Sequence, residues 1–161
     1  MLRPVEPSDT EAVRRLIASI YAEYDCVLDL EGVDSHLIVP GADVRAKGGD
    51  FWVVERHEAI EATCAVALYP DHAELKTLYV HPERRRRGWG SALVRFVARY
   101  VVAKERRRIV LWSDTRFHDA HRLYEGLGFR RFGTRELHDL NQTTEFGFEL
   151  DDASPLASTE G

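Results

Sequence analysis

A short stretch rich in arginine and glycine is the part of this sequence best suited to bind a charged ligand. It consists of Arg85, Arg86, Arg87, Gly88, Trp89, Gly90 and Ser91, and a long helical pattern follows it. Glycine lets the backbone turn tightly and approach a ligand. The first N–H groups of a helix lack intrahelical partners and, with the helix dipole, attract anions such as phosphate. Since arginine adds charge-assisted hydrogen bonds, we expect this stretch to hold a pyrophosphate.

The alternative is a solvated arginine run that precedes an ordinary capped helix. The stretch is neither a Walker loop nor a dinucleotide-binding fingerprint, because no Gly-Lys-Ser/Thr and no G-x-G-x-x-G is present. Its charge nevertheless stands out: residues 83–108 carry ten basic and two acidic side chains, whereas the whole chain has a net charge of −5. This local excess favours an anion site, while the overall acidity argues against general nucleic-acid binding.

The elements that must position this stretch follow from the hydrophobic pattern. Alternating or continuous apolar runs predict strands, and apolar residues at helical spacing predict helices. We expect strands at 2–5, 51–55, 60–69, 73–80, 109–112, 129–132 and 145–150, helices at 9–24, 91–101 and 117–127, and a short helix at 32–38 within a loop-rich region. This order predicts an α/β (α+β) mixed sheet rather than a doubly wound one. The chain should form one domain over residues 1–150, with a flexible tail at 151–161.

Composition excludes several classes of protein. No apolar run approaches the ~18 residues that a membrane-spanning helix needs, and the first residues lack the apolar segment of a secretory signal. With only two cysteines, Cys26 and Cys64, a disulfide framework is not expected. No His, Cys, Asp or Glu group has metal-ligand spacing. We therefore expect a cytoplasmic protein without a membrane anchor and without a metal.

Three segments, with their spacing, resemble a known family. They are Leu75-Lys76-Thr77-Leu78-Tyr79-Val80-His81-Pro82, the R-x-x-G-x-G at 85–90, and Leu123-Tyr124-Glu125-Gly126-Leu127-Gly128-Phe129. Together they resemble the GCN5-related N-acetyltransferases (GNAT superfamily), and the order of elements agrees over roughly 2–150. The resemblance implies a central, twisted, mostly antiparallel sheet with a splayed strand pair and flanking helices. It also implies acetyl-CoA as co-substrate, without a metal.

The resemblance assigns roles to particular positions. The main chain of Leu78, Tyr79 and Val80 would pair with the pantetheine arm of acetyl-CoA, because an opened strand presents unpaired backbone groups. Tyr124 would protonate the departing thiolate as a general acid; the alternative is a helix-face tyrosine that packs in the core. Glu74 would remove a proton from the incoming ammonium group; the alternative is an exposed edge-strand carboxylate.

Two positions depart from the family pattern. Many members have an asparagine at the position of Phe117, so that contact with pantetheine cannot be carried over. Many members have a glycine at the position of Glu61, and the sequence offers no account of this difference.

The function that follows is transfer of an acetyl group from acetyl-CoA to a primary amine, directly in a ternary complex. Carboxylates in loop 24–50 and in the last hairpin favour a small cationic acceptor, although they could equally form a solvated rim. A protein lysine or N-terminal acetyltransferase and a non-catalytic acyl-CoA sensor are the alternatives, and an RNA-associated protein is a more distant one. A homodimer is plausible on the resemblance alone.

Overall fold

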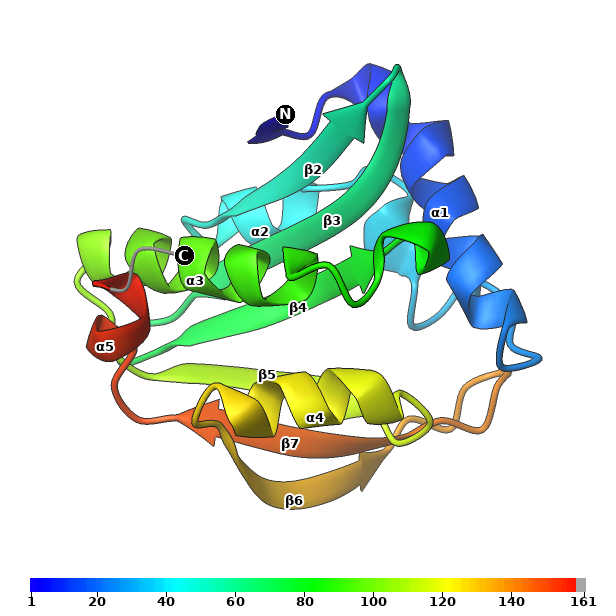
Figure 1. Ribbon diagram of the computed structural model, residues 1–161. Coiled ribbons are helices and arrows are strands. Elements are labelled where there is room, and N and C mark those ends of the chain that lie inside the picture. The colour runs from blue at the N-terminus through cyan, green and yellow to red at the C-terminus, as the bar shows by residue number, and fades with distance from the viewer. Residues whose placement is uncertain (159–161) are drawn as a thin grey trace.

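The computed structural model describes residues 1–158, and within them a single mixed sheet forms the centre of the molecule (Figure 1). Its strands are β1 (Leu2–Pro4), β2 (Asp50–Arg56), β3 (Ala59–Leu68), β4 (Ala73–Val80), β5 (Ile109–Asp114), β6 (Arg130–Glu136) and β7 (Thr144–Leu150). The strand order is β1-β2-β3-β4-β5-β7-β6. Only β4 and β5 pair in parallel, so the predicted mixed, mostly antiparallel sheet is confirmed.

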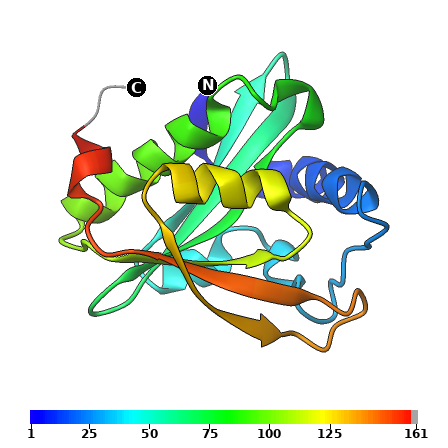
Figure 2. The same ribbon diagram turned by 60° about the horizontal axis from the view of Figure 1, so that its bottom comes forward.

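Helices cover both faces of the sheet (Figures 1 and 2). They are α1 (Thr10–Ala22), α2 (Ala42–Ala46), α3 (Trp89–Ala103), α4 (His118–Gly126) and α5 (Ser154–Ala157). One core lies between α3, α4, α5 and the sheet, and a second lies between α1, α2 and the opposite face. The helical spacing of Leu93, Val94, Val97 and Val101 explains the first, because these buried residues form one stripe along α3. This core fixes where the N-terminus of α3 lies.

The pairing of β4 with β5 stops halfway along β4. Parallel pairs join Ala73–Leu75 to Ile109–Leu111, and no later residue of β4 pairs with β5 in the described chain. A bulge interrupts the register between β3 and β4 at this point, where Thr77 adopts a positive φ of 54° and its carbonyl accepts a 2.8 Å hydrogen bond from the Thr63 hydroxyl. A bulge bends a strand, so β4 turns away from β5 (Figure 1). The expected splayed strand pair is thus present.

The structure differs from the sequence-based expectations in two segments. Residues 151–158 are not a frayed tail: Leu156 of α5 is buried, and Ala153 N–H bonds to the Arg107 carbonyl at 2.8 Å. The remainder of the expected tail, 159–161, lies outside the described residues. The short helix expected at 32–38 is a 3₁₀ turn, Ser35–Leu37, and α2 was not expected at all. No helix within residues 1–158 is long and apolar enough to cross a membrane.

Candidate active site

A cavity of about 580 Å³ lies where the second half of β4, the N-terminus of α3 and helix α4 meet. Its lining includes nine of the ten residues expected to bind the cofactor: Leu78, Tyr79, Val80, Arg85, Arg86, Gly88, Trp89, Gly90 and Ser91. The tenth, Arg87, is exposed and does not line it. Sequence reasoning did not identify Arg84, Asp119 or Arg122, which also line this cavity, and Tyr24, the first residue of the loop expected at the acceptor site, lines it as well. We call it the cofactor cavity.

Two glycines shape the loop beside this cavity. Gly88 precedes α3 with a φ of +82°, a left-handed conformation that favours glycine. Gly90 lies so close to α4 that a Cβ atom there would be 2.9 Å from a methyl carbon of Leu123. Gly88 is therefore needed for the backbone conformation, and Gly90 is needed for the close approach of α3 and α4. Both glycines bring the N-terminus of α3 to the cavity.

Ion pairs position Arg85, the first residue of this loop at 85–91 (the cofactor loop), and Arg84 just before it. Arg85 forms two 2.8 Å hydrogen bonds with the Glu23 carboxylate, just beyond α1, and its Nε donates to the Val80 carbonyl at 3.3 Å. Arg84 bonds to Glu61 at 2.9 and 3.3 Å, and this pair lowers the pKa of Glu61. The departure at Glu61 thus has a structural account, since its carboxylate holds Arg84 against β3.

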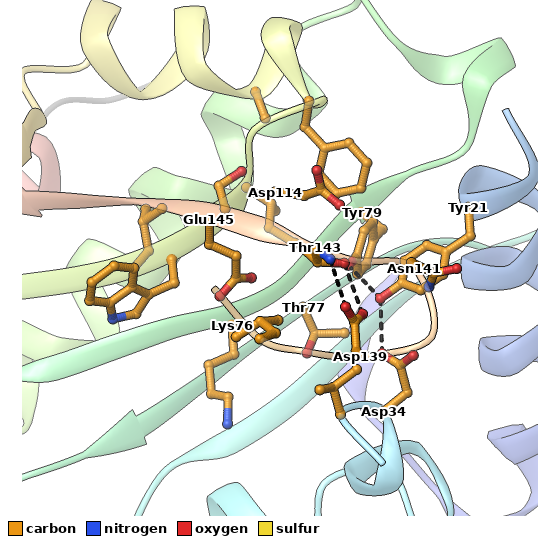
Figure 3. A pocket seen from close by; sticks show the side chains of 18 of the residues that line it. Tyr21, Asp34, Lys76, Thr77, Tyr79, Asp114, Asp139, Asn141, Thr143 and Glu145 are labelled. Carbon is orange, nitrogen blue, oxygen red and sulfur yellow. Dashed lines mark hydrogen bonds between the residues drawn. The ribbon is translucent and has the colours of Figure 1, made fainter. Parts of the chain in front are cut away.

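A second cavity, of about 360 Å³, opens on the other side of β4 where the strands diverge (Figure 3). Its lining contains five carboxylates, from Asp34, Glu74, Asp114, Asp139 and Glu145. Its lining also contains one lysine, Lys76, and one arginine, Arg135. Burial lowers the pKa of His36, which also lines it, so this imidazole is neutral near pH 7. The cavity therefore has an acidic lining, and we call it the acceptor cavity.

The two cavities share five lining residues, which form a junction between them: Leu78, Tyr79, Phe117, Ala120 and Tyr124. Tyr124 is only 5% exposed, and its hydroxyl makes no hydrogen bond within residues 1–158. Burial raises the pKa of Tyr124 above that of an ordinary phenol. The hydroxyl is therefore protonated at neutral pH and can donate a proton at the junction.

Glu74 lines the acceptor cavity but not the junction. It lies on β4 before the bulge, opposite Val110 of β5, and its carboxylate forms no ion pair or hydrogen bond among the described residues. Glu145 on β7 is held by Arg135 at 2.7 Å, and burial raises the pKa of the Glu145 carboxyl. Among the five carboxylates of this cavity, Glu74 is the one without a hydrogen-bond or ion-pair partner in residues 1–158.

Two loops meet across one end of the acceptor cavity. The Asn141 side chain accepts from Val27 N–H at 3.0 Å and donates to the Val27 carbonyl at 2.8 Å. Arg116 donates to the Asn141 carbonyl at 2.5 Å and also contacts the Cys26 thiol. Val27 and Asn141 are 114 residues apart in sequence, and Cys26 and Arg116 are 90 apart, so no local pattern could have indicated these contacts.

Aromatic side chains form the wall between the cavities. Phe117 packs against Tyr24 and Tyr79, with ring centroids 5.0 and 6.3 Å away. It therefore occupies the place of the family asparagine as an apolar wall. Sequence reasoning implicated only the main chain of Tyr79, whereas its half-buried side chain packs against Tyr21 and Phe117 and lines both cavities. The alternation of β4 gave no signal for this, because the bulge at Thr77 changes which face later residues occupy.

The sheet opens between two parallel strands. A helix N-terminus of the kind that binds phosphate lies on one side of the opening, and an acidic cavity lies on the other. This arrangement defines an acyltransferase-type site. Residues 47–131, more than half of the chain, match the family model described as an acetyltransferase (GNAT) domain. The chain belongs to the GNAT family of acetyltransferases.

Individual relatives agree with this family. N-acetylaspartate synthetase of Danio rerio is 29% identical over 134 residues, which are 81% of this chain and 45% of that protein. The chain thus spans less than half the length of this relative. A GNAT acetyltransferase of Staphylococcus aureus Mu50 superposes with a TM-score of 0.79 at 20% identity, over 92% of this chain and 96% of that one. An aminoglycoside 6'-N-acetyltransferase complexed with coenzyme A superposes with a TM-score of 0.68 at 14% identity, over 93% of this chain and 96% of that one.

Proposed function

We propose that this protein transfers the acetyl group of acetyl-CoA to the primary amine of a small cationic molecule, by direct transfer in a ternary complex. The observation that carries the proposal is the junction at Tyr124, where a cofactor cavity and an acidic cavity meet. Direct attack needs the amine and the thioester to be held next to each other, and two cavities with one common wall provide this.

Acetyl-CoA would occupy the cofactor cavity. Its pyrophosphate would lie at the N-terminus of α3, with Arg85 and Arg86 as charged partners. Its pantetheine arm would follow the main chain of β4 at Leu78–Val80, because this stretch has no partner strand on its β5 side in the described chain. The Val80 N–H would then polarise the thioester carbonyl.

The acceptor would enter as an ammonium ion and lose a proton to Glu74, directly or through water. Its nitrogen then attacks the thioester carbon at the junction, and Tyr124 donates its proton to the sulfur as the carbon–sulfur bond breaks. Five carboxylates against two cations in the acceptor cavity support a cationic substrate. The Asn141–Val27 contact supports a small molecule over a protein chain, because it closes one end of the cavity.

An acidic acceptor is the second candidate, because the Danio rerio relative is named for N-acetylaspartate. Lys76 and Arg135 would then have to bind its carboxylates. Arg135 already bonds to Glu145 at 2.7 Å, and Lys76 faces Asp43 at 3.6 Å. Both cations are thus partly neutralised by neighbouring carboxylates, which favours the cationic acceptor.

The test begins with thermal-shift titrations using acetyl-CoA, ATP and NAD at equal concentration, since a ligand of the folded state raises its melting temperature. We expect selective stabilisation by acetyl-CoA. Release of coenzyme A is then measured with polyamines, amino sugars, lysine, aspartate and lysine peptides. Turnover with the cationic small molecules supports the proposal, and Glu74→Gln should lower it by about 10²-fold or more. Turnover with aspartate or with peptides only would overturn the acceptor class, and binding without any turnover would favour an acyl-CoA sensor.

A further inference from the structure

A partly buried chain of polar groups leads away from the junction to a buried carboxylate that the mechanism above does not use. The hydroxyl oxygen of Tyr79 lies 3.4 Å from that of Tyr21. The Tyr21 hydroxyl donates to Asp34 Oδ1 at 2.9 Å (Figure 3). Asp34 is 3% exposed, and its other carboxylate oxygen accepts the N–H of Asp29 at 2.8 Å. The three side chains come from α1, β4 and the loop between α1 and α2, so only the fold brings them together.

The chemistry of these groups fixes the direction of the hydrogen bonds. An ionised carboxylate only accepts, so Tyr21 donates to Asp34 and its oxygen is left to accept from Tyr79. The Tyr79 oxygen then keeps its own accepting capacity for a group at the junction. Burial raises the pKa of both hydroxyls, and the neighbouring Tyr124 raises that of Tyr79 further. Both tyrosines therefore stay neutral, and each can pass on its own proton only as it accepts another.

The reaction itself requires a second proton acceptor. An ammonium nitrogen that ends as an amide loses two protons, the first before attack and the second once nitrogen has bonded to the carbonyl carbon. At that second moment the nitrogen is at the junction, which Tyr79 lines and Glu74 does not. The long Tyr79–Tyr21 contact fits this role, since catalytic hydrogen bonds often tighten only when substrate is bound.

We propose that Tyr79, Tyr21 and Asp34 form a relay that removes the second proton from the acceptor nitrogen; this inference rests on the proposed function. The N–H bond breaks as Tyr79 oxygen takes that proton. The proton that Tyr79 carried moves to Tyr21, and the proton that Tyr21 carried moves to Asp34, which becomes a neutral carboxylic acid. Tyr79 contacts the reacting nitrogen, and Tyr21 and Asp34 act through it.

The protons balance over the whole cycle. Nitrogen gives one proton to Glu74 and one to Asp34, while Tyr124 gives one to the sulfur of coenzyme A. One of the two protons taken from nitrogen restores Tyr124, and the other passes to water. Asp34 and Glu74 both line the acceptor cavity, so each can exchange with solvent after the product leaves.

Other charged groups face the relay from the elements around it. His36 lies in the 3₁₀ turn Ser35–Leu37, Asp43 on α2, Lys76 on β4 and Glu145 on β7. His36 interacts electrostatically with Lys76, Asp43 and Asp34, and Tyr79 interacts with Asp34 and Glu145. His36 is neutral near pH 7 because burial and Lys76 lower its pKa. Asp34 is the carboxylate of this set that bonds to Tyr21, so it is the terminus of the relay.

The test compares kcat of Tyr21→Phe, Asp34→Asn and their double variant with wild type, using acetyl-CoA and the best amine of the panel. Tyr21→Phe keeps the ring that packs on Tyr79 and removes only the hydroxyl. We expect kcat to fall at least about tenfold in each single variant, with little change in KM and a larger solvent deuterium isotope effect. The double variant should be no slower than the slower single variant, because a relay already interrupted cannot be interrupted again.

Tyr100→Phe is the matched control, since it also removes one tyrosine hydroxyl but lies outside both cavities. Melting temperatures of all variants show whether the fold is kept. The relay is overturned if Tyr21→Phe keeps kcat and the isotope effect of wild type, or if the single losses multiply in the double variant. Absence of any acetyl transfer by wild type with every amine would instead overturn the proposed function and, with it, the reaction that the relay serves.

Discussion

Glu23 and Arg85 join the end of α1 to the cofactor loop by two hydrogen bonds of 2.8 Å. The pair raises the pKa of Arg85 and keeps its guanidinium at the edge of the cofactor cavity. Residues just after Glu23 continue into the loop that closes the acceptor cavity. One ion pair therefore links the two halves of the candidate active site.

We expect Glu23→Gln to tighten binding of acetyl-CoA by about two- to fivefold, the effect of one exposed ion pair. The reason is competition: in the absence of ligand the Glu23 carboxylate pairs with the Arg85 guanidinium, to which we assign binding of the pyrophosphate. Calorimetric titration measures the change, and Glu11→Gln, an exposed carboxylate at the other end of α1, is the control. Weaker binding by Glu23→Gln would show that the carboxylate orients Arg85 for the ligand.

Gly88→Val should abolish acetyl-CoA binding while the protein stays folded. The backbone φ of +82° at Gly88 is strained for a β-branched residue, although a Cβ atom there would meet nothing within 4 Å. The loop would therefore change conformation, and the N–H groups at the start of α3 would move. Gly126→Val, at an equally open position without a positive φ, should bind normally. Normal binding by Gly88→Val would contradict the placement of the pyrophosphate.

Tyr124→Phe should lower kcat by about 10²-fold or more and leave acetyl-CoA affinity unchanged, because the hydroxyl acts only as the thiolate leaves. Since burial raises the pKa of Tyr124, wild-type kcat should not decline as pH rises to about 10, where an ordinary phenol ionises. Steady-state kinetics across this pH range measure both effects. An unchanged kcat in the variant would leave Tyr124 with a packing role in the core.

Asp9 gives a prediction for acid stability. It accepts hydrogen bonds from Arg3 at 2.8 and 2.9 Å and from Glu6 N–H at 2.8 Å, and the Arg3 guanidinium lowers the pKa of the buried carboxyl. A carboxyl whose pKa is lower in the folded state stabilises the fold above its ordinary pKa of about 3.9, and this stabilisation is lost as pH falls further.

Asp9→Asn should therefore lower the free energy of unfolding by about 1–3 kcal/mol at pH 7, the usual effect of hydrogen bonds to a charged group. The difference from wild type should shrink at pH 3. Urea unfolding at both pH values measures it. An equal difference at pH 7 and pH 3 would show that the charge of Asp9 contributes nothing.

Local sequence patterns were sufficient to predict the mixed sheet, the order of its strands along the chain, the three long helices and the loop before α3, but not α2 or α5. Glycines at 88 and 90, local arginines and a following amphipathic helix are adjacent along the chain, so their joint effect can be predicted locally. The stripe of Leu93, Val94, Val97 and Val101 likewise defines one helix face. Tyr124 and Glu74 were found by resemblance, and their assigned roles remain proposals.

Which side chains come into contact depends on the tertiary structure. The bulge at Thr77 opens the sheet and turns the Tyr79 side chain toward Tyr21, because one extra residue reverses the faces of a strand. His121 is buried, and its Nε2 atom lies 3.0 Å from the Asp114 carbonyl oxygen. Val27 and Asn141 meet only because the hairpin of β6 and β7 folds beside α1. Contacts between segments that are distant in sequence depend on packing, so a local pattern of residue types cannot predict them.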